Sequence, residues 1–301
     1  VVLAGAILGR FKEAKFSYPG GCDIGARPID SHLSSFKKLG VNITEDSGFI
    51  ICKADKIIGT NIDLDFPSVG ATENIILASI YAEGITQITN AAMEPEIVDL
   101  AKCLNKMGAK ITGAGTNIIK ITGVQKLKDK GYKDIKDRIE TGSLITPILI
   151  KLEEAGCDIN IEKNKVYMQA PKKMKTVDIK TMPYPGFPTD MQSIFASTLT
   201  TAKGTSVIVE NIFENRYRYT AELNKMGAKI TTEGKTAVIK GVKKLSGATV
   251  KSTDLRGGAC MVLAGLSAKG ITTVTNVEYI LRGYENLDKK FNSLGAKITI
   301  Q

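Results

Sequence analysis

The sequence of 301 residues contains no tryptophan and only one histidine, and phenylalanine, tyrosine and tryptophan together make up 6% of it. Its five cysteines are an odd number at irregular spacing, which excludes a disulfide framework and is typical of a reducing cytoplasm. A single histidine, His32, cannot complete a metal site with them. We therefore expect a cytoplasmic protein with no metal and no other cofactor.

Long hydrophobic runs are also missing. The longest run, VVLAGAIL at residues 1–8, is too short to cross a bilayer and lacks the flanks of a signal peptide, so we expect no membrane insertion. The net charge is +10, but the basic residues are spread along the chain without a stripe interleaved with aromatics, which argues against nucleic-acid binding. The charge instead favours an anionic small molecule, such as a phosphorylated or carboxylated substrate.

What the sequence does contain is an internal repeat of eight residues, in which two apolar positions precede a glycine and an isoleucine ends the pattern. The five copies are FKKLGVNI (36–43), LNKMGAKI (104–111), LEEAGCDI (152–159), LNKMGAKI (223–230) and FNSLGAKI (291–298). Each copy predicts the end of an amphipathic helix, a glycine with positive φ and the start of a strand.

A second shared element lies upstream of three copies. EGITQIT precedes Asn90, KGTSVIV precedes Glu210 and KGITTVT precedes Asn276, and each predicts a glycine turn that leads into a β-branched strand. Helices and strands therefore alternate in units of similar size, which stack to bury a shared core. With 43% hydrophobic residues, the chain can form one large core or two ordinary ones.

The spacing of the repeat is uneven. Gly108 and Gly156 are 48 residues apart, whereas the other neighbouring repeat glycines are 68 to 71 apart, so the third unit is short near residues 144–145. The first residues, VVLAG, match VLAG at 262–265, which lies in the middle of a predicted helix. We therefore expect a fragment that lacks the first unit and about twenty internal residues.

The stretch PGGCDIGARPID at 19–30 places Cys22 in a glycine-rich loop with Asp23 and Arg27 as charged neighbours. Two interpretations remain open for Cys22, because a free cysteine can be a small buried hydrophobe or an exposed, reactive thiol in an electropositive site. The four remaining cysteines lie in segments with apolar periodicity and are expected to pack in the core: Cys52, Cys103, Cys157 and Cys260.

Eight segments occur in the order found in UDP-N-acetylglucosamine 1-carboxyvinyltransferases. They are PGGCDIGARPID, PSVGAT, EPEIVD, DRIETG, FPTDMQ, FENR, STDLRGG and RGYE. On these segments, which extend over essentially the whole chain, the sequence resembles this family of enolpyruvyl transferases. It resembles more distantly the shikimate-pathway enolpyruvyl transferases, which lack the cysteine loop.

The resemblance implies an α/β (α+β) fold, a two-domain inside-out α/β barrel in which βαβαββ units place helices inside and sheets outside. The family has three such units in each domain, so five repeat copies imply that the first unit is absent. The domain junction is expected near Asp137. Residues 1–136 would then form most of the first domain, with the Cys22 loop, and 137–301 the second.

The resemblance also implies an activity: transfer of the enolpyruvyl group from phosphoenolpyruvate to the 3-hydroxyl of UDP-N-acetylglucosamine, with release of phosphate. This is the first committed step of peptidoglycan synthesis, and it links the chain to cell-wall biogenesis, cell shape and division and to inhibition by fosfomycin. The expected partners are these two small molecules, and the expected state is a monomer. The alternatives are a catalytically inactive sugar-nucleotide-binding fragment and, disfavoured by the Cys22 loop, a shikimate-pathway enzyme.

Addition followed by elimination needs a proton for C3 of the enol, a base near the sugar hydroxyl and cations for the substrate's charges. By resemblance, Cys22 supplies the proton and forms a covalent adduct, and Asp190 deprotonates the hydroxyl. Asp190 also has a structural interpretation as a helix N-cap. The family places a Lys-Asn pair and an arginine before Val1, and without them we expect little catalysis.

By resemblance, Arg27, Arg256 and Arg282 bind the phosphate and carboxylate of phosphoenolpyruvate, with Arg282 also catalytic. Arg256 and Arg282 could equally be solvated, or paired with Asp254 and Glu285. The sugar nucleotide is assigned to Arg27, Pro28, Ile29, Asp30, Ser31, Ser68, Val69, Gly70, Asp190 and Ile212. Phe66 stands where some relatives carry a lysine next to the diphosphate.

Overall fold

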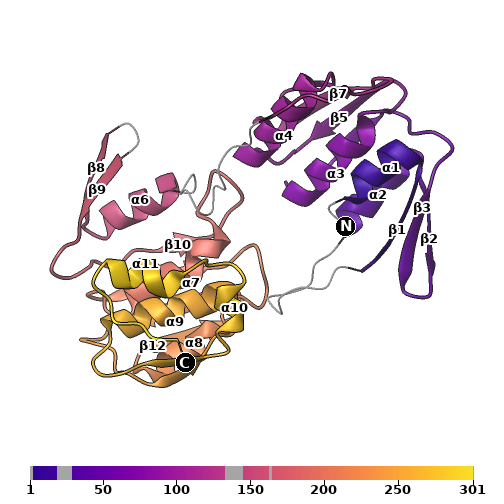
Figure 1. Ribbon diagram of the computed structural model, residues 1–301. Coiled ribbons are helices and arrows are strands. Elements are labelled where there is room, and N and C mark those ends of the chain that lie inside the picture. The colour runs from indigo at the N-terminus through magenta and orange to yellow at the C-terminus, as the bar shows by residue number, and fades with distance from the viewer. Residues whose placement is uncertain (1–2, 19–28, 133–144, 163–164, 301) are drawn as a thin grey trace. The chain divides into compact units, whose positions relative to one another are not determined.

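The computed structural model describes residues 3–18, 29–132, 145–162 and 165–300, and the chain divides into two compact units (Figure 1). Among the described residues, 3–18 and 29–132 belong to the first unit and 145–162 and 165–300 to the second. The junction predicted near Asp137 lies outside the described residues and stays a prediction.

The first unit alternates helices and strands as the repeat predicts. Its elements are α1 (Ala4–Phe11), β1 (Glu13–Ser17), α2 (Asp30–Lys38), β2 (Asn42–Asp46), β3 (Phe49–Lys53), β4 (Asn61–Asp63), α3 (Val69–Ser79), β5 (Ile85–Thr89), α4 (Pro95–Lys106), β6 (Lys110–Thr112) and β7 (Ile118–Thr122). The run β4, α3, β5, α4, β6, β7 is one complete βαβαββ unit.

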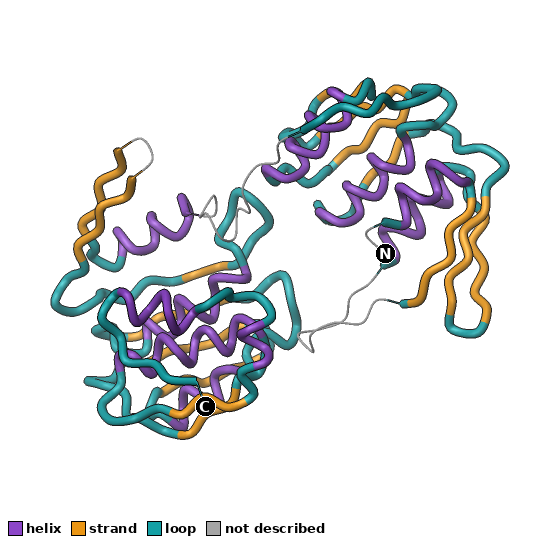
Figure 2. Tube along the Cα trace, in the orientation of Figure 1, coloured by secondary structure: helices purple, strands orange, loops and turns teal. Residues whose placement is uncertain are grey.

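This βαβαββ unit forms a four-stranded sheet in the order β4-β5-β7-β6, with β4 parallel to β5 and the other pairs antiparallel. A second sheet has the order β1-β3-β2. Alternate residues of β5 and β7, among them Ile88, Ile119 and Ile121, are fully buried, while their neighbours are more exposed. One face of the sheet therefore covers the helices and the other faces solvent, the arrangement visible in Figure 2.

The second unit repeats the same plan. Its elements are α6 (Ile145–Glu154), β8 (Asp158–Glu162), β9 (Lys165–Gln169), β10 (Ile179–Lys180), α7 (Thr189–Leu199), β11 (Thr205–Val209), α8 (Tyr219–Lys225), β12 (Lys229–Glu233), β13 (Thr236–Lys240), β14 (Thr249–Lys251), α9 (Leu255–Ser267), β15 (Thr273–Thr275), α10 (Glu278–Leu281) and α11 (Leu287–Ser293).

The sheet order in this unit is β10-β11-β13-β12, which matches β4-β5-β7-β6 strand for strand. The run β10, α7, β11, α8, β12, β13 is thus a second complete βαβαββ unit. β14 pairs in parallel with β15, and β8 pairs with β9 as a separate antiparallel hairpin. The predicted α/β architecture of repeated units is confirmed.

The repeat glycines do what the sequence predicts. Gly227 has a φ of 88°, and its N–H bonds to the Asn224 carbonyl at 3.0 Å while that of Ala228 bonds to the Leu223 carbonyl at 3.1 Å. The Asn224 side chain also bonds to both backbone groups of Ile230, at 2.9 and 3.0 Å. The Asn105 and Asn292 side chains make the same pair of bonds, which explains the asparagine in three of the five copies. After the fifth copy, however, residues 296–300 form no strand, so the strand predicted there is wrong.

Each unit has its own hydrophobic core. In the first, α1 packs so closely on α3 that a Cβ at Gly9 would lie 2.8 Å from the Leu77 carbonyl oxygen. Cys52, Cys157 and Cys260 are buried as predicted, and Cys103 is half-buried. Throughout the described residues, no helix is long and apolar enough to span a membrane, and they hold no cluster of three metal-ligating side chains.

Candidate functional site

Asp190 lies in the first turn of α7, but it does not cap this helix. The N-cap position is taken by Pro188, whose extended backbone leads into Thr189 as the first helical residue. The N-cap interpretation of Asp190 is therefore wrong, because a capping side chain must belong to the residue before the first helical one. The Asp190 carboxylate is instead bonded to two arginines.

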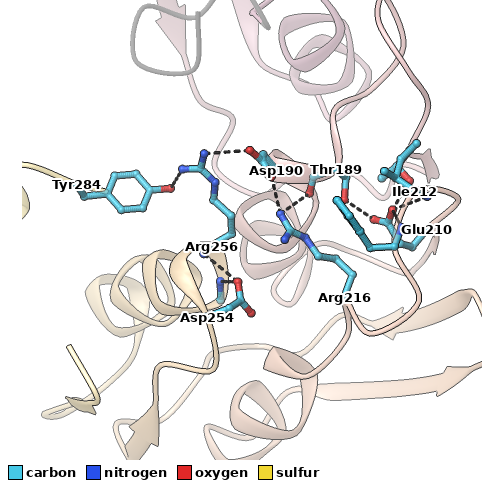
Figure 3. A network of polar contacts seen from close by, with 11 residues as sticks. Thr189, Asp190, Glu210, Ile212, Arg216, Asp254, Arg256 and Tyr284 are labelled. Carbon is cyan, nitrogen blue, oxygen red and sulfur yellow. Dashed lines mark hydrogen bonds and ion pairs between the residues drawn. The ribbon is translucent and has the colours of Figure 1, made fainter. Parts of the chain in front are cut away.

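The two arginines come from different parts of the second unit (Figure 3). Arg216, in the turn before α8, places its Nη2 2.7 Å from Asp190 Oδ1, and Arg256, on α9, places its Nη2 3.0 Å from Oδ2. The Arg216 and Arg256 side chains are 3% and 10% exposed, whereas that of Asp190 is 32% exposed. The carboxylate is thus the part of this cluster most open to solvent.

Arg256 is held in place by the start of its own helix. The Asp254 side chain caps α9 by accepting bonds from the N–H groups of Arg256 and Gly257, both at 3.0 Å. The expectation that Asp254 pairs with the Arg256 guanidinium is therefore wrong, since the cap bonds occupy this carboxylate at the backbone. The guanidinium bonds to Asp190 and, through Nη1, to the Tyr284 hydroxyl at 2.7 Å.

The charge of Arg256 is stabilised by these two partners. Burial by itself lowers the pKa of the guanidinium, but the negative charge of Asp190 and the hydroxyl of Tyr284 outweigh this effect, so the pKa is raised. The Tyr284 ring also lies 5.3 Å from the guanidinium carbon. Arg256 is thus a permanently charged donor at the site.

Arg282 is exposed at the C-terminal end of α10, with its guanidinium carbon 5.6 Å from the centroid of the Tyr279 ring. Tyr284, two residues further along, is the residue that contacts Arg256. The structure therefore brings the segment that carries Arg282 next to the Asp190 cluster.

Ile212 belongs to a turn that is fixed by a buried carboxylate. Its N–H bonds at 2.8 Å to Oε1 of Glu210, which also accepts bonds from Thr181 and Thr189. Sequence reasoning assigned no role to Glu210, Arg216 or Tyr284, although FENR and RGYE contain the last two. Their burial and contacts depend on the packing of distant segments, and an isolated Arg or Glu is expected at the surface.

In the first unit, the structure brings together two of the segments assigned to the sugar nucleotide. Ser68 caps α3, with its Oγ 3.3 Å from the Ala71 nitrogen, and Val69 and Gly70 form the first turn. Ile29 is the N-cap residue of α2, which begins at Asp30 and Ser31. The helices meet at His32, whose ring lies 3.3 Å from a Cβ built at Gly70.

The lone histidine is part of this contact rather than of a metal site. His32 Nδ1 lies 3.1 Å from the Asn74 amide nitrogen, which also donates to the Gly70 carbonyl. Burial lowers the pKa of His32, so the neutral ring is favoured. Helix α3 thus presents its N-terminus beside a neutral, hydrogen-bonded imidazole, a geometry that suits an anion.

Cys22, Arg27 and Pro28 lie outside the described residues, so their roles stay predictions. Phe66, on the segment before α3, is 45% exposed. It adds no positive charge beside the Ser68 cap.

Comparison with known proteins agrees with the fold. The EPSP synthase (3-phosphoshikimate 1-carboxyvinyltransferase) family model matches residues 1–150 and 143–291. UDP-N-acetylglucosamine 1-carboxyvinyltransferase 2 of Caldanaerobacter subterraneus subsp. tengcongensis is 50% identical over 319 positions, which cover 99% of this chain and 76% of the relative. The UDP-N-acetylglucosamine 1-carboxyvinyltransferase of Thermodesulfovibrio yellowstonii is 49% identical, with 99% and 77% covered.

These alignments of 319 positions are longer than the chain itself, so the relatives hold residues within them that have no counterpart here. Among solved structures, the enolpyruvyl transferase NikO from Streptomyces tendae has a TM-score of 0.86 at 23% identity, over 99% of this chain and 76% of that one. An EPSP synthase from Acinetobacter baumannii has a TM-score of 0.71 at 18% identity, with 99% and 78% covered.

Proposed function

The chain belongs to the enolpyruvyl transferase family, and on this premise we propose that it transfers the enolpyruvyl group of phosphoenolpyruvate to the 3-hydroxyl of UDP-N-acetylglucosamine. Phosphate is released in this reaction. The proposal is supported by relatives that carry this activity in their names at about half identity over 99% of the chain. Neither the shikimate-pathway reaction nor an inactive binding protein is favoured by those relatives.

The observation that carries the proposal is the Asp190 carboxylate held between Arg216 and Arg256. Phosphoenolpyruvate brings a phosphate and a carboxylate, so its site needs fixed, desolvated cations. Arg256 supplies one on the first turn of α9. The exposed Arg282, on the segment next to this cluster, can supply a second.

The proposed reaction assigns one proton transfer to each end of the double bond. Asp190 accepts the proton of the sugar 3-hydroxyl while the hydroxyl oxygen bonds to C2 of phosphoenolpyruvate. Cys22 gives a proton to C3. In the elimination that follows, C3 gives a proton back to the Cys22 thiolate, the C2–O bond to phosphate breaks and the enol ether forms. The proton held by Asp190 leaves with the released phosphate. The arginines stabilise the charge that moves onto the departing phosphate.

The contacts of Asp190 support a way in which substrate binding prepares the base. Arg256 bonds to Asp190 at 3.0 Å, yet the same guanidinium is proposed to bind phosphoenolpyruvate. A substrate anion that bonds to Arg256 would compete with Asp190 Oδ2 for the guanidinium and leave this oxygen available for the sugar hydroxyl. Arg216, which is more deeply buried, would keep its bond to Oδ1 and hold the carboxylate in position.

The sugar nucleotide is assigned to Ile212 in the second unit and to the first turns of α2 and α3, with Arg27 and Pro28, in the first. We further propose that the protein works in peptidoglycan synthesis, and hence in cell shape and division, because the relatives' names give UDP-N-acetylglucosamine as the substrate. We propose that it does so as a cytoplasmic monomer.

Phosphate release from phosphoenolpyruvate tests the proposal directly. In the full-length protein, which includes the Lys-Asn pair and the arginine expected before Val1, we expect release with UDP-N-acetylglucosamine and none with shikimate 3-phosphate. Mass spectrometry should find the enolpyruvyl ether of the sugar nucleotide. Equal release with shikimate 3-phosphate, or none with either acceptor, would overturn the proposed substrate.

A further inference from the structure

Glu210 is a fully buried carboxylate directly after β11, and it accepts four hydrogen bonds (Figure 3). Oε1 accepts from the Thr181 hydroxyl at 2.9 Å, the Ile212 N–H at 2.8 Å and the Phe213 N–H at 3.1 Å. Oε2 accepts from the Thr189 hydroxyl at 2.9 Å. A buried carboxylate needs such donors because they replace its lost hydration.

The donors belong to three separate segments of the second unit. Thr181 follows β10, Thr189 is the first residue of α7, and Ile212 and Phe213 lie in the turn after β11. The N-cap residue of α7, Pro188, makes no side-chain cap bond. The start of this helix is instead bonded to Glu210, through the hydroxyl of Thr189. A negative charge is also favourable at a helix N-terminus.

The other repeat units carry a different residue at this position. Asn90 and Asn276 occupy it with positive φ values of 54° and 57°, and the Asn90 side chain donates to the Leu64 carbonyl at 2.7 Å. Glu210 instead reaches across to α7. The repeat unit that has Glu210 at this position is also the unit in which the first turn of the helix, α7, carries Asp190.

We propose that Glu210 is a positioning residue for the transfer reaction: its carboxylate fixes Thr189, and with it the adjacent Asp190, relative to the turn that carries Ile212. This rests on the proposed function, because Asp190 and Ile212 are the assigned contacts to the sugar nucleotide. One buried group thereby couples the orientation of the base to that of the sugar-contacting turn.

Four variants and one control test this role. Glu210→Ala removes all four bonds, whereas Glu210→Gln keeps an acceptor for Thr181, Ile212 and Phe213, and the Thr189 hydroxyl can rotate to accept from the new amide. Thr189→Val removes only the bond to α7, and Thr189→Ser restores it. Asn90→Gly is the matched control, because it deletes the side-chain bond at the same repeat position and keeps the positive φ available.

The measurements are kcat and the two KM values by phosphate release, the Kd of UDP-N-acetylglucosamine by calorimetry, and Tm. We expect Glu210→Ala to lower kcat about 10- to 100-fold, because small displacements of a reacting group cost this much, and to weaken UDP-sugar binding with the KM for phosphoenolpyruvate unchanged. Thr189→Val should lower kcat roughly fivefold. Glu210→Gln, Thr189→Ser and Asn90→Gly should stay within about threefold of the parent protein.

The outcomes distinguish a positioning role of Glu210 from a role in stability alone, and failure of either from failure of the proposed function. If Glu210→Ala lowers Tm but keeps the parent kcat when assayed well below its Tm, the carboxylate is structural only and the proposal is wrong. The same conclusion follows if Glu210→Gln loses as much as Glu210→Ala. If the parent protein releases no phosphate, the proposed function fails, and the positioning role fails with it.

Discussion

Substitution of Arg256 offers the sharpest test of the anion site. Arg256→Ala removes a guanidinium that is 10% exposed, bonds to Asp190 at 3.0 Å and to Tyr284 at 2.7 Å, and lies 5.3 Å from the tyrosine ring centroid. We expect a large loss for phosphoenolpyruvate and a small one for UDP-N-acetylglucosamine, because the guanidinium is proposed to bind the smaller anion.

The size of the expected loss in phosphoenolpyruvate binding depends on which bonds of Arg256 the substrate replaces. Loss of one partner of a desolvated charge pair costs roughly 2 to 5 kcal/mol. Arg256 already bonds to Asp190 and Tyr284, so the substrate would replace existing bonds, and we expect the lower end of this range. A loss of about 2 kcal/mol corresponds to a KM for phosphoenolpyruvate raised roughly 30-fold.

The same substitution should cost little stability. Asp190 is 32% exposed and keeps its 2.7 Å bond to Arg216, so the free energy of unfolding should fall by only about 1–2 kcal/mol. Tyr284→Phe is the matched comparison, since it keeps the ring beside Arg256 and removes one hydroxyl, and it should raise the KM for phosphoenolpyruvate by less than about fivefold.

The assay is phosphate release at varied phosphoenolpyruvate, together with calorimetric titration of UDP-N-acetylglucosamine and urea unfolding of each variant. Equal losses for the two substrates would refute the assignment of Arg256 to phosphoenolpyruvate. An unchanged KM for phosphoenolpyruvate would show that the guanidinium serves only to hold Asp190.

Arg282→Ala should also raise the KM for phosphoenolpyruvate more than the Kd of UDP-N-acetylglucosamine, and the opposite order would contradict its assigned role. Fosfomycin should alkylate Cys22, as a mass gain on the peptide that contains PGGCDIGARP, because its phosphonate mimics the substrate anion beside the thiol; equal labelling of Cys103 with Cys22 protected would contradict this. Asn224→Ala should lower the free energy of unfolding by about 1–2 kcal/mol, because it deletes two bonds to backbone groups of the following strand, at 2.9 and 3.0 Å. Asn292→Ala deletes the same two bonds at a more exposed copy, so we expect urea unfolding to show a smaller loss of unfolding free energy than for Asn224→Ala. Equal losses would argue against the role of burial.

Sequence reasoning predicted the helix-glycine-strand pattern correctly in four of the five copies because its causes are local. A glycine such as Gly227 is required wherever the backbone leaves a helix with positive φ, and this requirement can be read from eight residues. The burial of Cys52, Cys157 and Cys260 followed from apolar periodicity in the same way. The family, and through it the inside-out barrel, could be recognised because short segments recur in a fixed order.

The partners of the charged side chains could not be predicted from the sequence. Both Asp190 as a helix cap and Asp254 as the partner of the Arg256 guanidinium were reasonable local interpretations, and both are wrong in the structure. Sequence neighbours compete with groups that packing brings in from far along the chain, and Arg256 meets a carboxylate 66 residues away. Such a pairing depends on how α7 and α9 are packed.

The sequence by itself thus determined where most of the helices end and strands begin, which apolar segments form the core and to which family the chain belongs. Only the tertiary structure decided that Asp190 lies between two arginines and that Glu210 ties α7 to the turn of Ile212. The physical reason is one of range. Backbone conformation and apolar periodicity act over a few residues, whereas a buried charge is stabilised by whichever donors the folded chain places within about 3 Å of it.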